Sequence, residues 1–371
     1  MNDIRAFVDS EIVPRADGFD AEGKLPRTLV DTLAARGWLG ASIAAAFGGG
    51  GWDPVAIGRL HGEMGRGCAS VRSLLTVQTM VATALQRWAS ESVQVEILPL
   101  LASGAKLAAF ALSEAAAGSD ARALTTRACR GDGGFVLDGE KRWVSFGQVA
   151  DVFLVFAKLD GSMAAFLVDG DAPGLQRRPV TGLLGMRAAQ LASIELRGCR
   201  VPLARRIGGG DLPFSSVAVT ALDVGRYSVA WGCVGLAEAC LEASVAYAMG
   251  RQQFGKRLLD HQLVARHVAQ MVAGTRAARL LCEQAGERRA ARAGDATWVT
   301  QIAKYFATTT AFAAANAAVQ VHGAVGCMAG SAVERHFRDA RIMEIVEGST
   351  EIHELMITRA PELESLGRKG R

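Results

Sequence analysis

The chain lacks any apolar run long enough to cross a membrane. Its longest apolar stretches, such as "VFLVFA" at 152–157, fall far short of the ~20 residues that a spanning helix needs. The N-terminus reads Met1-Asn2-Asp3, with no basic start followed by an apolar run, so we predict no secretory signal. Half of the 371 residues are hydrophobic and only 21% are charged, which argues against disorder. These features predict a folded cytoplasmic protein with no membrane partner.

Signatures of metal, disulfide and nucleic-acid chemistry are missing too. The seven cysteines include no C-x-x-C pair and the six histidines no H-E-x-x-H, so we predict no disulfide framework and no metal site. "GGGG" at 48–51 is neither a P-loop nor a G-x-G-x-x-G after a strand, which favours a flexible loop. The net charge is +4, and the one arginine-rich run, "GERRAARAG" at 286–294, is interpreted as a solvated helix end. Because no aromatics for stacking bases accompany it, we expect an anionic small ligand rather than nucleic acid.

Three blocks of different periodicity follow one another along the chain. Residues 1–108 read as helices, which predicts an N-terminal helical domain. Residues 109–213 read as short strands joined by tight turns, with Asp138-Gly139 and Asp160-Gly161 as two-residue turns, which predicts an antiparallel β-barrel or sandwich. From 214 to 371, three long alanine-rich runs and a C-terminal stretch predict a four-helix bundle. The predicted fold class is therefore α+β, with three domains.

The C-terminal stretch "EIVEGSTEIHELM" at 344–356 holds four carboxylates at the spacing of one helix face. They are Glu344, Glu347, Glu351 and Glu354. A solvated stripe opposite a buried apolar face is the simpler interpretation. Gly348 argues against a continuous helix, because glycine costs about 1 kcal/mol relative to alanine in a helix interior. We predict that the chain turns here, and we keep open that one of the carboxylates takes a proton from a substrate.

Six separated motifs carry a resemblance to a known family. They are "AFALSEAAAGSD" (109–120), "GEKRWVSFG" (139–147), "LDVGR" (222–226), "RQQFGKRLLDHQ" (251–262), "VQVHGAVGC" (319–327) and "VERHFRDARIMEIVEGSTEI" (333–352). In this order and spacing they resemble the acyl-CoA dehydrogenase superfamily of flavoproteins, over nearly the whole chain. The resemblance implies FAD as the cofactor and an oxidoreductase acting on a CH–CH or CH–OH group.

The resemblance also implies two groups of FAD-binding residues. Trp143 offers an aromatic face for the flavin ring, and Ser145, two residues along a strand, would point the same way. The implied contacts near the ring and pyrophosphate are Phe110, Leu112, Ser113, Ser119, Trp143, Ser145, Ser349 and Glu351. The implied contacts to the adenine end of a neighbouring subunit's FAD are Arg251, Gln253, Phe254, His261, Gln262 and Gln320. Sites shared in this way imply a homodimer or homotetramer. Ala115 and Ala324 depart from the family's proline and glycine at these positions.

Val346-Glu347-Gly348-Ser349 is similar to the family's Y-E-G-T segment, which makes Glu347 the implied catalytic base. Burial beside a flavin and an acyl chain raises a carboxylate's pKa toward working pH. In the family the base takes the α-proton of an acyl thioester, backbone and ribityl donors stabilise the enolate, and the β-hydrogen leaves as hydride to flavin N5. Asp223 and Arg226 match the family's active-site pair at the start of a bundle helix.

The stretch "CASVRSLLTVQ" at 68–78 aligns with the family helix that lines the acyl end of the pocket. It places Arg72 and Ser73 where fatty-acyl members carry apolar or small residues. Because a buried arginine needs a partner, we hypothesise a short polar substrate whose hydroxyl or carboxylate meets Arg72. The alternative is that Arg72 pairs with an aspartate or glutamate of the protein itself.

The same stretch is similar to a family branch from polyketide extender-unit (methoxymalonyl-type) pathways. Members of this branch oxidise a small hydroxyacyl group, such as a glyceryl or hydroxymalonyl unit, held on an acyl carrier protein. We therefore predict an FAD-dependent dehydrogenase of such a thioester, with an electron-acceptor flavoprotein as a further partner to consider. The alternatives are a short-chain acyl-CoA dehydrogenase that forms a 2,3-enoyl-CoA, a flavin oxidase on the same fold, and a non-catalytic FAD-binding protein.

Overall fold

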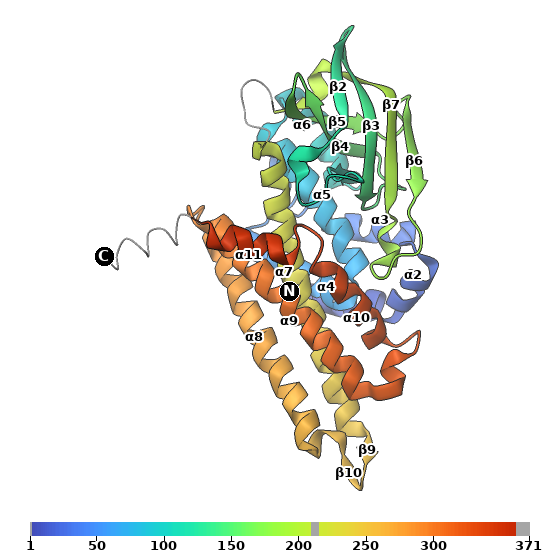
Figure 1. The fold of residues 1–371 in the computed structure, drawn as a ribbon, viewed down its shortest axis with the longest axis vertical. Helices are drawn as coiled ribbons and strands as arrows, with labels where there is room; N and C mark the ends of the chain where they lie inside the picture. The colour runs from blue at the N-terminus through green and yellow to red at the C-terminus, as the bar shows by residue number, and fades with distance from the viewer. Residues whose placement is uncertain (1, 209–214, 361–371) are drawn as a thin grey trace, which may run out of the picture.

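Helices make up the N-terminal part of the protein. The computed structural model describes residues 2–208 and 215–360, drawn as a ribbon in Figure 1. The first helices are α1 (Asn2–Phe7), α2 (Ala16–Glu22), α3 (Arg27–Ala35), α4 (Pro54–Gly67), α5 (Ala69–Trp88) and α6 (Glu91–Ala102). Nearly every residue of α5 is buried. It packs between β1 and the longest helix of the C-terminal part, which makes it a central support of the molecule.

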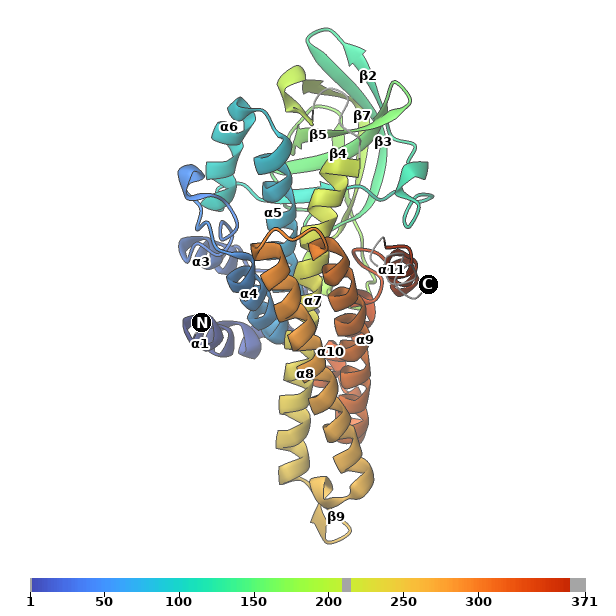
Figure 2. The ribbon, with the colours of Figure 1, turned by 90° about the vertical axis from the view of Figure 1, so that its left-hand side faces the viewer.

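The middle part is one eight-stranded sheet. Its strands are β1 (Ala108–Ala111), β2 (Arg127–Gly131), β3 (Gly134–Val144), β4 (Val152–Leu159), β5 (Ser162–Asp169), β6 (Leu175–Pro179), β7 (Ala192–Pro202) and β8 (Arg206–Ile207). The strand order is β6-β7-β3-β2-β4-β5-β8, with β1 added beside β4. Most pairs are antiparallel, as predicted, but β1 and β2 both pair with β4 in parallel. Figure 2 shows α5 and α6 beside this sheet.

Of the two predicted hairpin turns, one is wrong and one is confirmed. Asp138 and Gly139 lie inside β3, and the real turn is at 132–133, where Gly131 of β2 pairs with Gly134 of β3. The register between β3 and β7 shifts at Gly139, which marks a bulge. A side chain there would come within 2.6 Å of the Thr126 hydroxyl, so close packing, not a turn, requires this glycine. The turn at 160–161 joins β4 to β5 as predicted.

Long helices form the C-terminal part. They are α7 (Ser215–Gly250), α8 (Gln262–Ala290) and α9 (Ala296–His322), with a small hairpin of β9 (Gln252–Gln253) and β10 (Lys256–Arg257) between the first two. The C-terminal stretch is two short helices, α10 (Ala332–Met343) and α11 (Thr350–Thr358), instead of one long fourth helix. The predicted boundary between the middle and C-terminal domains, at 213–214, lies outside the described residues. Figure 1 shows the hairpin at the end of the bundle farthest from the sheet.

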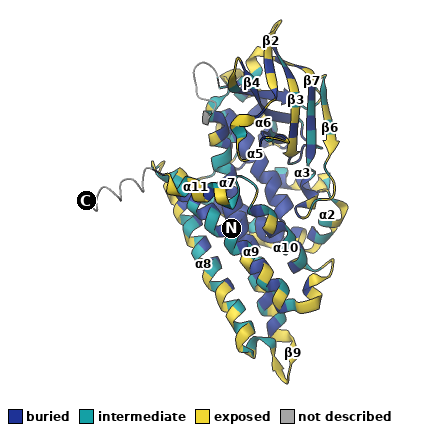
Figure 3. Cartoon of the chain, in the orientation of Figure 1, coloured by how far each residue is buried: buried dark blue, intermediate teal, exposed yellow. Residues whose placement is uncertain are grey.

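α7 is the core helix of the whole protein. Among the described residues, only its segment 216–250 has the length and composition of a membrane span, and 61% of the most apolar window is buried inside the protein. Helices α4, α5, α8 and α9 all pack against α7, and Figure 3 shows the buried residues concentrated where they meet. Its apolar composition is therefore explained by burial against other helices.

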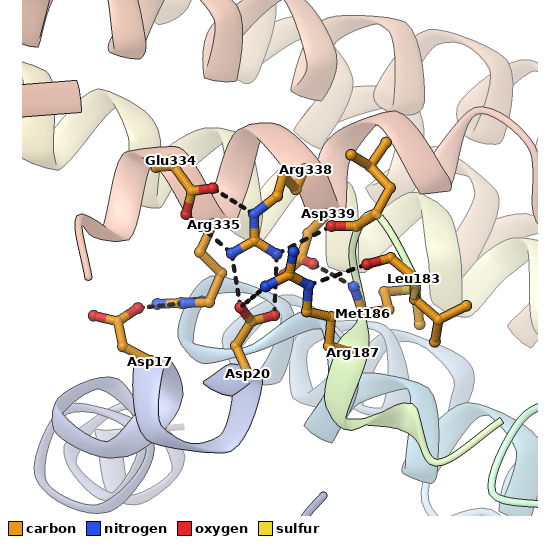
Figure 4. A network of polar contacts seen from close by, with 10 residues as sticks. Asp17, Asp20, Leu183, Met186, Arg187, Glu334, Arg335, Arg338 and Asp339 are labelled. Atoms are coloured by element: carbon orange, nitrogen blue, oxygen red, sulfur yellow. Dashed lines mark hydrogen bonds and ion pairs between the residues drawn. The ribbon is translucent and has the colours of Figure 1, made fainter. Parts of the chain in front are cut away.

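A polar network joins all three parts of the protein at α10 (Figure 4). Arg338 of α10 donates to both carboxylate oxygens of Asp20 in α2, at 2.7 and 3.2 Å, and to the Leu184 carbonyl in the loop after β6. Asp339 accepts a hydrogen bond of 2.6 Å from the Met186 N–H of the same loop. Arg335 binds Asp17 at 2.7 Å. Because α10 leads directly into residues 344–349, this network fixes the segment that carries Glu347.

Removal of the Arg338 side chain tests this network. In an Arg338→Met variant, the largely shielded Asp20 carboxylate would keep only the longer ion pair with Arg187, at 3.7 Å, and we expect the free energy of unfolding to fall by about 3 kcal/mol. Denaturant unfolding of the holoprotein measures the change. The matched control is Arg27→Met, which breaks the exposed pair with Asp31 and one hydrogen bond to the Gly104 carbonyl and should cost only about 1 kcal/mol. Equal losses in the two variants would contradict the proposed importance of the network.

Candidate active site

The loop between α10 and α11 reverses the chain through two consecutive left-handed residues. Glu347 has φ +58° and Gly348 has φ +101°. The predicted turn at Gly348 is therefore confirmed. It begins one residue earlier, at Glu347. A glutamate in the left-handed region is uncommon and is held there only when its surroundings enforce it. Ser349 then caps α11, its hydroxyl accepting from the Ile352 N–H at 3.5 Å.

Glu347 is the one carboxylate of the four that points into the protein. Its Oε2 is buried and has no hydrogen-bond partner among the described residues. The carboxyl lies against the backbone of α7, where a Cβ on Gly225 would be 2.5 Å from Oε2. Burial raises the pKa of Glu347 to about 7, although the positive charges of Arg226, Lys304 and Arg72 favour the ionised form. The group can therefore accept or release a proton near neutral pH.

The other three carboxylates do not point into the protein as Glu347 does. Glu344 is bound by Arg341 at 2.6 Å. Glu351 and Glu354 are exposed on α11. Hydrogen bonding within its own segment, including one from Ser349, lowers the pKa of Glu351, so it stays ionised. The helix-like spacing of the four residues in the sequence therefore does not correspond to one helix face, because the turn at Gly348 separates them.

Two cations hold the backbone of this loop. The Arg226 Nε donates to the Glu347 carbonyl at 3.1 Å, and the Lys304 Nζ of α9 donates to the Gly348 carbonyl at 2.7 Å. Both side chains are buried, and Lys304 is fully so. His353 lies against Gly348, with both ring nitrogens unpartnered among the described residues. Burial lowers the pKa of His353 to about 3, so its ring is neutral.

Arg72 is a buried cation that forms no ion pair with any described residue. Its side chain is 2% exposed, and its guanidinium donates to the Thr76 hydroxyl at 3.0 Å and to the Met343 sulfur at 3.1 Å. No described aspartate or glutamate lies within ion-pair distance, so the alternative of an internal carboxylate partner is not observed. A hydrogen-bonded chain continues from Thr76 through Ser228 to His61. Ser73, the neighbour of Arg72, is buried as well.

Asp223 has a different partner from the one its position suggests. It binds Arg289 of α8 at 2.5 Å rather than Arg226. Arg289 comes from the run 286–294, which was interpreted as a solvated helix end. The interpretation is wrong for this residue, because its side chain is only 15% exposed and lies over the Tyr227 ring. The pair therefore braces the start of α7 against α8, next to Arg226.

The end of β3 presents Trp143 to solvent. The indole is 56% exposed and its backbone is left-handed, with φ +60°. Arg142 is exposed as well, so strict alternation fails between Arg142 and Trp143, whereas Val144 is buried and Ser145 lies half-buried just after the strand. The next residue, Phe146, donates its N–H to Ala189, in the loop that Asp339 of α10 holds. The exposed ring thus lies on a segment tied to the helix that precedes Glu347.

A buried ion pair supports this rim from behind. Lys141 is fully buried and binds Glu114 at 2.7 Å and the Leu112 carbonyl at 3.1 Å. Burial opposes ionisation of Glu114, but hydrogen bonds from Lys141, Thr126 and Thr125 lower its pKa to about 2. The pair fixes the strand end at Leu112 and Ser113 relative to β3. Of the other predicted residues here, Phe110 packs on Phe156 with 5.1 Å between ring centroids, and Ser119 is exposed.

The second predicted cofactor group lies at the hairpin end of the bundle. Phe254 is 94% exposed at the tip of the β9–β10 turn. The ring of His261 bonds to the Gln253 carbonyl at 3.0 Å and lies 6.1 Å from that of Phe254. Arg251, Gln262 and Gln320 are exposed. The structure thus brings Gln253, Phe254 and His261 together, far from Glu347 in the same chain.

The three domain models of one family match this chain. The N-terminal domain of acyl-CoA dehydrogenases matches residues 1–105, the middle domain residues 109–199 and the C-terminal domain residues 215–361. The chain belongs to the acyl-CoA dehydrogenase family. It is accordingly an oxidoreductase with FAD as its cofactor. The exposed indole of Trp143 fits the flat ring of this group, and the neighbouring Arg142 N–H binds the Ser113 carbonyl at 2.9 Å.

Three solved structures of the family are informative. FkbI, for biosynthesis of the methoxymalonyl extender unit of the Fk520 polyketide, is 38% identical, with a TM-score of 0.90 over 96% of this chain and 98% of that chain. A glutaryl-CoA dehydrogenase from Mycobacterium smegmatis in complex with FADH2 is 28% identical, with a TM-score of 0.92 over 96% and 92%. The prolyl acyl carrier protein oxidase AnaB is 25% identical, with a TM-score of 0.92 over 96% of each chain.

A Gly225→Ala substitution tests the fit of the Glu347 carboxyl against α7. The added methyl would lie 2.5 Å from Oε2, so the carboxyl must move, and a displacement of about 1 Å can cost about 100-fold in rate. We expect substrate-dependent flavin reduction to slow by at least about 10-fold while bound FAD, measured by absorbance, is unchanged. Gly250→Ala, on the same helix with open space around it, is the control. An unchanged rate in Gly225→Ala would contradict this packing.

Proposed function

We propose that this protein is a dehydrogenase of a short, polar acyl thioester in which Glu347 is the base. The observation that carries the proposal is the buried, unpartnered Oε2 of Glu347, with the pKa of this carboxyl near 7. A carboxylate of this kind is a stronger base than one in water, because burial disfavours its charge. It is also the one buried carboxylate among the described residues of this loop.

The residues around the site divide the work. Glu347 takes a proton from the substrate, while Arg226 and Lys304 hold its backbone. When bound, FAD supplies the hydride acceptor, which no side chain of the site can provide. The residues that would hold its ring are Trp143, Ser145, Leu112 and Ser113, with Phe110, Ser119, Ser349 and Glu351 nearby. Arg251, Gln253, Phe254, His261, Gln262 and Gln320 would contact the FAD of a partner subunit, so we propose a homodimer or homotetramer.

The buried guanidinium of Arg72 is the basis for the proposed acyl group. A buried guanidinium without a direct ion-pair partner is costly unless a ligand supplies the missing charge or hydrogen bonds. We propose that Arg72 and Ser73 meet a hydroxyl or carboxylate of a hydroxyacyl group, of the glyceryl or hydroxymalonyl kind, carried by an acyl carrier protein. The carbinol carbon would lose the hydride and Glu347 would accept the hydroxyl proton. Support comes from the methoxymalonyl and acyl-carrier-protein relatives, and from the carboxylate that a glutaryl group carries.

The pH dependence of flavin reduction tests the base. Since Glu347 must be ionised to accept a proton, the rate should rise about 10-fold per pH unit below about pH 7 and level off above it. Glu347→Gln should bind FAD normally and fail to bleach it with substrate at any pH. Stopped-flow absorbance measures both enzymes. Bleaching by Glu347→Gln at the wild-type rate would exclude this residue as the base.

A comparison of the same acyl groups on two carriers tests which acyl group and which carrier the enzyme uses. Glyceryl, hydroxymalonyl, butyryl and octanoyl groups are each loaded on an acyl carrier protein and on CoA, and mass spectrometry identifies the product. We expect bleaching by the hydroxyacyl groups on carrier protein, and its loss in Arg72→Met. Fast oxidation of butyryl-CoA to its 2,3-enoyl product would favour a short-chain acyl-CoA dehydrogenase instead. Strong activity on octanoyl thioesters would contradict a polar acyl site.

A further inference from the structure

Lys304 is unusual among the lysines of this chain. It lies in the middle of α9, its side chain is fully buried, and no described aspartate or glutamate forms an ion pair with it. Its one hydrogen bond within the described residues is the 2.7 Å donation to the Gly348 carbonyl. A buried ammonium loses most of its hydration, and a single carbonyl does not replace it. Stability alone therefore gives little reason for a lysine at this position.

The position of Lys304 gives another reason. Gly348 follows Glu347, and both residues are left-handed. Arg226 binds the first carbonyl of the pair from α7, and Lys304 binds the second from α9. The two helices thus hold consecutive peptide groups, and the conformation between them directs the Glu347 carboxyl toward Gly225. We propose that Lys304 is a positioning residue, which acts through the Gly348 carbonyl to hold the Glu347 carboxyl in place and to favour its ionised form.

The charges that face this loop come from several elements. Arg226 on α7, Arg72 on α5 and Lys304 on α9 all lower the pKa of Glu347, against the larger effect of burial. His353 on α11 is neutral and adds no charge. Burial lowers the pKa of Lys304 itself to about 8, so it is charged at neutral pH. Removal of this charge leaves Arg226 and Arg72, and the pKa of Glu347 must then rise above its value near 7.

The test uses holoenzyme variants at residue 304. Lys304→Met keeps an unbranched side chain that is one atom shorter and removes both the charge and the donor, whereas Lys304→Gln, of the same length as Met, removes the charge and keeps a donor. Thr308→Val is the matched control, because Thr308 is fully buried one turn along α9 and bonds only to carbonyls of its own helix. Difference infrared spectroscopy, with Glu347→Gln as the reference, follows the titration of the Glu347 carboxyl without substrate. The thioester that reduces the wild-type flavin fastest gives kcat and KM.

We expect Lys304→Met to lower kcat by about 10-fold or more, since a misplaced base slows proton transfer, and to leave KM and bound FAD unchanged. The Glu347 titration should move upward by about one pH unit. Lys304→Gln should recover part of kcat, and Thr308→Val should change neither quantity. A Lys304→Met enzyme with wild-type kcat and titration, even if less stable, would overturn the proposal. A Lys304→Gln enzyme no faster than Lys304→Met would overturn the hydrogen-bond route.

The inference rests on the proposed role of Glu347, and the two can fail separately. If no thioester bleaches the wild-type flavin, the proposed function fails. The infrared titration needs no substrate, so it would still decide whether Lys304 sets the ionisation of Glu347.

Discussion

The candidate site depends on one carboxylate oxygen, Oε2 of Glu347, which is shielded from water and has no hydrogen-bond partner among the described residues. The Glu347 carboxyl lies against α7. The backbone of this residue is left-handed, a conformation that residues other than glycine rarely adopt. Several distant elements act together to maintain this state. Gly225 leaves the space, Arg226 and Lys304 hold the two carbonyls, and the network at α10 fixes the approach of the chain. Burial of this carboxylate lowers the stability of the protein, but the same burial raises its pKa to about 7, as the proposed base requires.

Arg72, at the proposed acyl end of the site, is likewise a buried charged group, here positive, without an ion-pair partner among the described residues. Arg72 is buried among Thr76, Ser228 and Met343, none of which carries a negative charge. We propose that Glu347 accepts a proton and that Arg72 binds a polar group of the substrate. If the acyl group lies here as proposed, a saturated hydrocarbon tail would cover this cation without offering it a further acceptor, so Arg72 would also discriminate against a fatty acyl group.

Sequence reasoning reached those parts of the site that depend on short-range patterns. The order of helical and strand-rich blocks and the turn at Gly348 follow from spacing and local residue types, whereas the choice of Glu347 among the four carboxylates came from the family resemblance. The hairpin turn placed at Asp138-Gly139 failed because close packing on Thr126 can require a glycine as much as a turn does. Lys304 and Arg289 escaped detection since each lies in an ordinary helical pattern, and only tertiary packing brings them to Glu347 and Asp223.

The length of α7 has a consequence for how a large ligand can be bound. Arg226, beside the base, and Gly250, where the hairpin begins, are 24 residues apart on this one continuous helix. At a rise of 1.5 Å per residue, their separation is about 36 Å. An extended FAD molecule is shorter than this distance. The exposed Phe254 therefore lies too far from Glu347 of the same chain for one FAD to contact both. Two subunits of this kind, arranged head to tail, could each complete the other's site.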